Sequence, residues 1–236
     1  MFTESAELYD LIYHTFKDYA AEATQVAQLL RRFHSSCCTV LDVACGTGEH
    51  AFRLAMDHGF VVDGLDLDPE LLNVARKKHP AGRFFEADMS SFELPHRYDA
   101  ITCLFSSIGY LRTLDRVEQA LRCFRAHLTL RGIIVVEPWF APHALRVGDG
   151  TPHTGKTAGV TVERTSHTEI DGRLSRLRFD YRVTSSEGVR QMTETHELGL
   201  FTPDELLATF ERSGLAARYD PQGLTGRGLY VATIAA

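Results

Sequence analysis

The chain has 236 residues and a mass of 26.4 kDa, which suits one large domain or a core domain with an insertion. Its 44% apolar and 24% charged residues are ordinary for globular proteins and exclude a disordered or fibrous chain. The net charge of −6 leaves no basic surplus for a phosphate backbone, so we expect no nucleic acid partner.

The first half of the chain alternates short apolar runs with helical patterns. Near-continuous apolar runs predict buried strands over Thr39–Val43, Phe60–Asp66, Tyr98–Leu104 and Gly132–Glu137. Apolar residues spaced three and four apart predict helices over Ala20–Phe33, Pro69–His79 and Leu114–Leu128. This alternation is typical of a parallel sheet with helices on both faces, so we expect a doubly wound, Rossmann-like α/β fold.

The pattern changes after Pro138. Residues Ala141–Gly159 are rich in Gly, Pro, His and Thr and predict a long loop or lid. Alternating segments then predict three strands, with turns at Asp171-Gly172 and Ser185–Gly188. The strands are Val160–His167, Arg173–Thr184 and Val189–Phe201. We therefore expect an antiparallel β insertion after the fifth strand of the main sheet.

The last segment returns to the pattern of the core. Thr202 predicts the N-cap of a helix over Pro203–Ser213, and Gly214 predicts its end. Two closing strands, Leu215–Tyr219 and Leu229–Ile234, are expected to complete the first sheet. The chain thus divides into a core with an N-terminal helical cover (1–138), an insertion that covers the substrate (139–201) and a C-terminal part that completes the sheet (202–236).

Cellular location and metal content are predicted from what the sequence lacks. No apolar run approaches the roughly 18–20 residues that span a bilayer, and the first residues do not have the pattern of a secretory signal. The five cysteines and eleven histidines show no metal-ligand spacing. We expect a cytoplasmic protein without membrane contact, disulfides or metal.

A glycine-containing turn follows the first predicted strand, in the string VLDVACGTGEH (Val40–His50). Gly46 and Gly48 let the backbone turn sharply and approach a ligand. Ligands of doubly wound sheets lie beyond the carboxyl ends of the strands, where this turn is expected. The spacing alone does not separate a dinucleotide site from other nucleoside sites, because Ala51 stands where the dinucleotide pattern tolerates either Gly or Ala.

Three carboxylates fall at successive strand ends. Asp42 can receive an amine or a hydroxyl, Asp66 can accept both hydroxyls of a ribose, and Asp88 can accept an adenine amine with Met89 beside the ring. The simpler interpretation is that Asp42 and Asp88 cap strand ends and turns. Their common register favours a nucleoside site.

The string from Asp42 to Gly48, together with EADMSSF (Glu86–Phe92), resembles the class I S-adenosylmethionine-dependent methyltransferases. The resemblance implies S-adenosylmethionine as cofactor and a class I methyltransferase sheet. It implies further that Asp42, Gly46 and Gly48 border the methionine part, Asp66 the ribose and Asp88 the adenine. The other expected cofactor contacts are Ala44, Leu67, Met89 and Leu104.

Seven strings in one order carry a closer resemblance. They are AELYD (Ala6–Asp10), KDY (Lys17–Tyr19), Val40–Gly48, FSSIGYL (Phe105–Leu111), Ile134–Phe140, RTSH (Arg164–His167) and TGRGLY (Thr225–Tyr230). This series is similar to the TDP-amino-sugar N,N-dimethyltransferases of desosamine and mycaminose biosynthesis. The resemblance implies two methyl transfers to a sugar amine still linked to thymidine diphosphate, with Tyr9 and Tyr19 at the donor's carboxylate.

The acceptor site is expected after the fourth strand. Methyl transfer is an in-line displacement that needs an unprotonated amine, so positioning and a nearby acceptor or base would help. Ser107 and Tyr110 are the candidate catalytic residues and also substrate contacts. Some members of the family have His at the position of Tyr110, which argues against an obligatory strong base. Packing of the Tyr110 ring on the core is the alternative.

Further substrate contacts are predicted from residue chemistry. Arg227, between two glycines, suits a guanidinium held close to a diphosphate, while Arg178 is expected on a solvated face. Trp139 can stack on a base or wall the sugar pocket. Arg164 and His167 are the remaining candidates.

More than one function stays open at this point. The relatives carry an additional upstream tyrosine, where only Met1 and Phe2 precede in this chain, and a second Trp in place of Phe140, which favours a methyltransferase for another small amine or hydroxyl. A non-catalytic S-adenosylmethionine-binding module and a nicotinamide oxidoreductase also stay open. The inserted strands can also pair two subunits, so we consider a homodimer.

Overall fold

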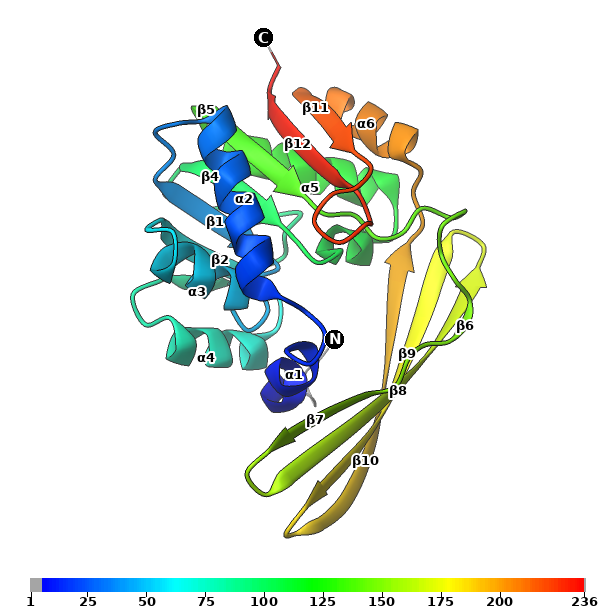
Figure 1. Cartoon of the computed structure of the whole chain (residues 1–236). Coiled ribbons are helices and arrows are strands. Elements are labelled where there is room, and N and C mark those ends of the chain that lie inside the picture. The colour runs from blue at the N-terminus through cyan, green and yellow to red at the C-terminus, as the bar shows by residue number, and fades with distance from the viewer. Residues whose placement is uncertain (1–5, 236) are drawn as a thin grey trace.

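The apolar runs of the sequence form the centre of a seven-stranded sheet in the computed structural model, which describes residues 6–235. The strand order is β11-β12-β5-β4-β1-β2-β3 (Figure 1). The strands are β1 (Thr39–Val43), β2 (Val61–Asp66), β3 (Phe84–Glu86), β4 (Tyr98–Cys103), β5 (Leu128–Val136), β11 (Leu215–Asp220) and β12 (Leu229–Ile234). β1 to β5 pair in parallel, and β12 runs antiparallel to β5 and β11. The predicted α/β fold is confirmed.

Helices cover both faces of this sheet (Figure 1). The helices of the described chain are α1 (Ala6–Tyr13), α2 (Tyr19–Phe33), α3 (Glu49–Met56), α4 (Pro69–Lys78), α5 (Leu114–Ala126), α6 (Pro203–Arg212) and the 3₁₀ helix η1 (Ser107–Leu111). Alternate strand residues point to opposite faces, so Val40 packs in a core with α2 to α4 while Leu41 packs in a core with α5 and α6. Thr202 caps α6 as predicted, in a capping box with Glu205.

A second, antiparallel sheet lies beside the first one (Figure 1). Its strands are β6 (Gly148–Asp149), β7 (His153–Thr157), β8 (Val160–Asp171), β9 (Leu174–Ser185) and β10 (Gly188–Gly199). The expectation of three strands, with a loop over 141–159, was wrong, because β6 and β7 fall inside that segment and both pair with β8. These short strands are mostly exposed, so their pairing comes from β8 rather than from a hydrophobic pattern of their own.

Helix α1 joins the two sheets. Ile12 packs in a third core with Val162, Phe179 and Tyr181 of the second sheet. At Gly155 of β7 an added Cβ would lie 2.5 Å from the carbonyl oxygen of Leu11, so glycine permits this close approach. The space between α1, the second sheet and the carboxyl ends of β1 to β5 is therefore enclosed on several sides.

Two further findings concern metal sites and membrane-spanning helices. Among residues 6–235, no group of three or more His, Cys, Asp or Glu side chains is arranged to hold a metal ion. In the same part of the chain, no helix is long and apolar enough to cross a membrane. Phe2, named above among the departures from the family pattern, lies outside the described residues.

Candidate active site

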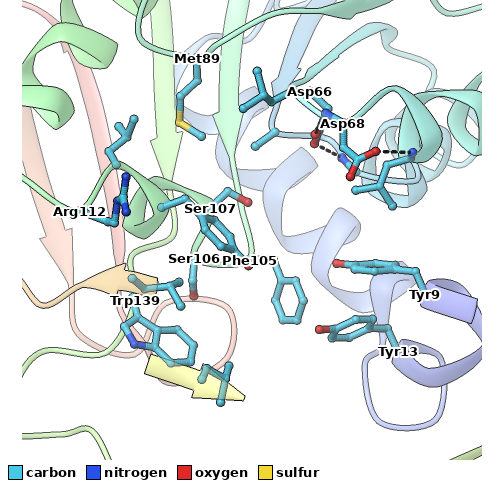
Figure 2. A pocket seen from close by; sticks show the side chains of 18 of the residues that line it. Tyr9, Tyr13, Asp66, Asp68, Met89, Phe105, Ser106, Ser107, Arg112 and Trp139 are labelled. Carbon is cyan, nitrogen blue, oxygen red and sulfur yellow. Dashed lines mark hydrogen bonds between the residues drawn. The ribbon is translucent and has the colours of Figure 1, made fainter. Parts of the chain in front are cut away.

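A cavity of about 570 Å³ lies at the carboxyl ends of the parallel strands, between α1 and the second sheet. This volume suits a small organic ligand or cofactor. Figure 2 shows Tyr9 and Tyr13 reaching from α1 toward Phe105, with Trp139 across from them. The candidates from the sequence that line the cavity are Tyr9, Ala44, Gly46, Asp66, Leu67, Asp88, Met89, Ser107, Tyr110, Trp139, Arg164 and Arg227. Tyr19, Asp42, Gly48, Leu104 and His167 are not among the lining residues.

Asp66, at the end of β2, is the carboxylate best positioned to accept hydrogen bonds from a ligand in the cavity. Its Oδ2 accepts from the backbone of Gly46 at 2.8 Å and its Oδ1 accepts from the backbone of Asp68 at 2.9 Å. Burial raises the pKa of Asp66 above its ordinary value. A carboxylate has about four lone-pair sites, so both oxygens keep capacity for two ligand hydroxyls. Leu67 and Met89 add apolar wall, which fits the adenosine part of S-adenosylmethionine.

Asp88 stabilises a turn and also lines the cavity. Its Oδ1 accepts from the backbone and hydroxyl of Ser90 at 2.8 and 2.7 Å, and its Oδ2 accepts from Arg116 at 2.8 Å. Burial would raise the pKa of Asp88, but these hydrogen bonds outweigh it and lower the pKa. The simple interpretation of Asp88 as a turn residue therefore describes its present bonds, and its position on the cavity wall keeps it available to a ligand as well.

The glycine-containing turn after β1 supports the packing of the fold and also borders the cavity. A Cβ on Gly48 would lie 2.9 Å from Cβ of Ala75, so this glycine permits α4 to pack closely. Asp42 is only 2% exposed and accepts from Thr102 at 2.8 Å. Its Oδ2 has no hydrogen-bond partner within the described part of the chain, and burial raises its pKa. Leu104 is 3% exposed and packs in the core with α2 to α4.

The aromatic residues of α1 divide between the cavity and the core. The Tyr9 and Tyr13 rings lie 4.2 Å apart, and Tyr13 meets Phe105 edge-on at 5.2 Å. Burial raises the pKa of both tyrosines, so both remain protonated at neutral pH. Tyr13 is buried and also lines the cavity. Tyr19 packs against His50 at 5.0 Å and is not among the lining residues.

Unfavourable backbone conformations gather at this cavity. Four non-glycine residues in the described part of the chain have positive φ, and all four line it. They are Ala44, Phe105, Ser106 and Arg112, with φ between 52° and 67°. Such conformations cost on the order of 1–3 kcal/mol each and persist where the surroundings hold them. Their clustering supports a functional site here.

Glu137, after β5, ties two cavity loops together. Its side chain is fully buried and accepts from the Phe105 backbone at 2.7 Å and from the Thr225 hydroxyl at 2.6 Å. The Arg227 guanidinium lies 3.5 Å away. The carboxylate therefore fixes the loop after β4 relative to the C-terminal Gly226–Gly228 turn.

Glu137→Gln is expected to lower the free energy of unfolding by about 2–3 kcal/mol, because the amide loses the charge opposite Arg227 and turns a donor toward other donors. Urea unfolding measures this change. Glu187→Gln, on an exposed turn, is the matched control and should change stability by less than about 0.5 kcal/mol. Equal urea midpoints for the two variants would contradict the bridging role of Glu137.

Two arginines, Arg227 and Arg164, place positive charge on the wall of the cavity. Arg227 donates to the hydroxyls of Ser106 at 3.0 Å and Thr225 at 2.9 Å, and its guanidinium lies over Phe105. Arg164 is 5% exposed, with its guanidinium 4.4 Å from the Phe179 ring centroid and Nε and Nη1 unpartnered within residues 6–235. A buried guanidinium with unused donors favours an anionic ligand.

His167 and Arg178 lie on the outward faces of β8 and β9. His167 is half-exposed, and its ring hydrogen bonds to Asp149 of β6 at 2.6 Å. Because side chains alternate along a strand, Arg164 and Ser166 face the cavity while His167 points away. His167 is not among the residues that line the cavity, and its expected substrate contact stays a prediction. Arg178 is exposed and pairs with Asp180, as expected for a solvated face.

Several lining residues were missed by the sequence analysis. Phe16, Phe105, Ser106, Asp68, Arg116 and Phe179 belong to this group. The alternation of Leu177, Phe179 and Tyr181 in β9 was a usable signal, since alternate residues share one face. Nothing in the local sequence indicated the positive φ of Phe105 and Ser106.

Comparison with known proteins gives consistent results. The profile of a family described as "Methyltransferase domain" matches residues 40–132. The dTDP-3-amino-3,6-dideoxy-alpha-D-glucopyranose N,N-dimethyltransferase of Streptomyces fradiae is 39% identical over 96% of this chain and 89% of its own length. The dTDP-3-amino-3,4,6-trideoxy-alpha-D-glucopyranose N,N-dimethyltransferase of Streptomyces venezuelae is 36% identical over 97% of both chains.

Solved structures agree with the sequence relatives. DesVI of Streptomyces venezuelae superposes with a TM-score of 0.92 at 36% identity, covering 98% of both chains. CalS10 from Micromonospora echinaspora, an amino pentose methyltransferase with S-adenosylmethionine bound, has a TM-score of 0.84 at 35% identity. The match covers 94% of this chain and 93% of CalS10.

Proposed function

Because the chain belongs to the S-adenosylmethionine-dependent N,N-dimethyltransferases of nucleotide-linked amino sugars, we propose that it methylates the amine of a TDP-linked deoxyamino sugar twice. The observation that carries this proposal is the near full-length match to relatives that act on such sugars. The cavity agrees with it, because its wall carries the carboxylates Asp66 and Asp88 as well as the arginines Arg164 and Arg227. The enzyme class, a methyltransferase that uses S-adenosylmethionine, follows from the same relatives.

The cofactor fits the acidic end of the cavity. S-adenosylmethionine supplies a methyl group activated by a sulfonium centre. We assign Asp66 to the ribose hydroxyls and Asp88 to the adenine amine, with Leu67 and Met89 along the base. Ala44, Gly46 and Tyr9 would border the methionine part. Asp42 is assigned a supporting role behind the loop, where its buried oxygen still has acceptor capacity.

The acceptor sugar is assigned to the space between η1 and the second sheet. Ser107 and Tyr110 would hold the amine in line with the activated methyl group, which is the main contribution that positioning makes to such a displacement. Arg164 and Arg227 would hold the diphosphate, with Trp139 and Phe140 as walls for the sugar or its base. We propose that the insertion shields this space from water.

Mass spectrometry tests the proposal directly. The purified protein is incubated with S-adenosylmethionine and each of the three TDP-amino sugars named for its relatives, with a TDP-sugar lacking the amine as control. We expect one and then two added methyl groups on nitrogen for at least one amino sugar, and none on the control. Methylation at oxygen, or no product with any nucleotide sugar, would overturn the proposal in favour of another small amine or hydroxyl.

We also propose a homodimer, because β10 has 12 residues and pairs with only one strand in the described chain, β9. An unpaired strand edge of this length favours pairing with a second copy. Light scattering with size-exclusion chromatography would decide between monomer and dimer. A cytoplasmic location stays a prediction.

A further inference from the structure

A buried histidine and glutamate lie directly behind Tyr110. The Tyr110 hydroxyl is 3.0 Å from Nδ1 of His196, and Nε2 of His196 is 3.8 Å from a carboxylate oxygen of Glu194. The His196 side chain is fully buried, and the Glu194 side chain is 7% exposed. Tyr110 itself lines the cavity and is 38% exposed. The three groups therefore form a row from the cavity surface into the inserted sheet.

The strand register explains this row. Residues two apart on a strand share a face, so Glu194 and His196 of β10 point the same way. Their partners across β9 are Phe179 and Leu177, both of which line the cavity. The Phe179 ring lies 5.3 Å from the His196 ring and separates it from Arg164 on the next strand. A titratable pair is thus held beside Leu177 and Phe179, with Tyr110 between it and the cavity.

The reaction needs an outlet for protons. In each transfer the nitrogen lone pair forms a bond to the methyl carbon, while the carbon–sulfur bond breaks and its electron pair stays on sulfur. The product nitrogen is positively charged and must lose a proton before it can attack again. Tyr110 is a poor base on its own, because burial raises its pKa and so favours the neutral hydroxyl.

We propose that His196 is the proton acceptor for the sugar amine, acting through the Tyr110 hydroxyl, and that Glu194 supports it. The ammonium gives a proton to the Tyr110 oxygen as the Tyr110 proton passes to Nδ1 of His196. The result is a neutral amine, an unchanged tyrosine and an imidazolium facing the Glu194 carboxylate. His196 and Glu194 are positioning residues in this scheme, since neither contacts the substrate. The inference rests on the proposed function, because it requires an amine substrate.

Other charged and titratable groups face the same space. Tyr13 of α1, Asp66 at the end of β2, Tyr181 of β9 and Glu194 of β10 all act electrostatically on Tyr110 and raise its pKa further. Arg164 of β8 lies on the far side of Phe179. The proposal depends on the pair of His196 with Glu194, whose side chains lie 3.8 Å apart.

His196→Asn is the test variant, because the asparagine oxygen can still accept from Tyr110 but cannot take a proton. At pH 7 we expect kcat/KM for the amino sugar to fall by about 100-fold, within the range of general base catalysis. At about pH 9.5, where more of the amine is neutral in solution, the loss should shrink to less than about 5-fold. The ratio of monomethylated to dimethylated product at pH 7 should rise. Binding of S-adenosylhomocysteine should not change.

Tyr110→Phe interrupts the same path at the cavity and should show the same pH-dependent loss. The double variant should lose no more than about threefold beyond either single variant, because groups that act as a unit are not additive. Thr195→Ala, on the outward face of β10, is the matched control and should keep wild-type kinetics. The relay is overturned if wild type methylates the sugar while His196→Asn, folded by circular dichroism, stays within threefold of it at pH 7, or if the loss does not depend on pH. Failure of wild type on every amino sugar would instead overturn the proposed function.

Discussion

Asp66→Ala is expected to weaken the binding of S-adenosylhomocysteine by about 100-fold at neutral pH. The carboxylate is proposed to accept both ribose hydroxyls, and hydrogen bonds to a charged group contribute about 1.5–3 kcal/mol each. The substitution also removes the acceptor for the backbone of Gly46, which loosens the turn after β1. Isothermal calorimetry measures this affinity without any need for the acceptor sugar.

Asp66→Asn separates charge from shape in the same experiment. The amide keeps one acceptor oxygen, so we expect a loss of only about 10-fold. Because burial raises the pKa of Asp66, wild-type affinity should begin to fall at a higher pH than for an ordinary aspartate, as the acceptor becomes protonated. Affinity of the asparagine variant should be flat over that range. Wild-type affinity in both variants would refute the ribose assignment.

The main sheet could be predicted from the sequence because its signal is local. The apolar runs at β1 and β4 and the helical spacing of α2 each need only a few neighbouring residues to be recognised. The strands β6 and β7 could not be predicted in this way. They are short and exposed, and β8 supplies the hydrogen bonds that make them strands.

A motif identifies a site more reliably than it assigns each of its residues. The turn after β1 does border the cavity, through Ala44 and Gly46. Gly48 instead permits α4 to pack closely against the turn. The sequence does not reveal this role, because Ala75 of α4 is distant in the chain. Tyr19 and His167 are not among the residues that line the cavity: the first packs against His50 of α3, and the second hydrogen bonds to Asp149 of β6.

The contacts that the sequence could not predict are those between distant segments. Tyr110 and His196 are 86 positions apart and meet because β10 passes over η1. Glu137 and Thr225 are 88 positions apart, and their hydrogen bond joins the core to the C-terminal turn. Both depend on the placement of the second sheet or of β12, so neither leaves a local pattern. They also link the insertion and the C-terminal strands to the same cavity.

The proposed function assigns separate roles, donor binding and acceptor binding, to the two halves of the cavity. The donor side is built from the parallel strand ends, where Asp66 and Asp88 stand. The acceptor side is built from η1, the antiparallel sheet and the turn that carries Arg227. Substitutions on the acceptor side should therefore change the kinetics for the sugar and leave cofactor affinity unaffected.

Arg227→Gln is the sharpest case of this kind. We expect it to raise KM for the nucleotide sugar by about 100-fold, with kcat within about threefold of wild type, because the proposed bidentate contact to the diphosphate is lost. The guanidinium is already held by Ser106 and Thr225 and lies over Phe105, so little ordering is needed when an anion binds. Steady-state kinetics at saturating S-adenosylmethionine measure both parameters.

Arg227→Lys keeps the charge but loses the planar fork, so its KM should rise only about 10-fold. Arg178→Gln removes an exposed arginine that pairs with Asp180 on the outer face of β9, and its kinetics should match wild type. Together these variants distinguish a local diphosphate contact from a general effect of charge. An unchanged KM in Arg227→Gln would leave the diphosphate to Arg164, whose Nε and Nη1 have no hydrogen-bond partner within residues 6–235. An equal rise in Arg227→Gln and Arg178→Gln, with Arg227→Lys unchanged, would mean that the long-range field of the protein, rather than a bound guanidinium, attracts the substrate.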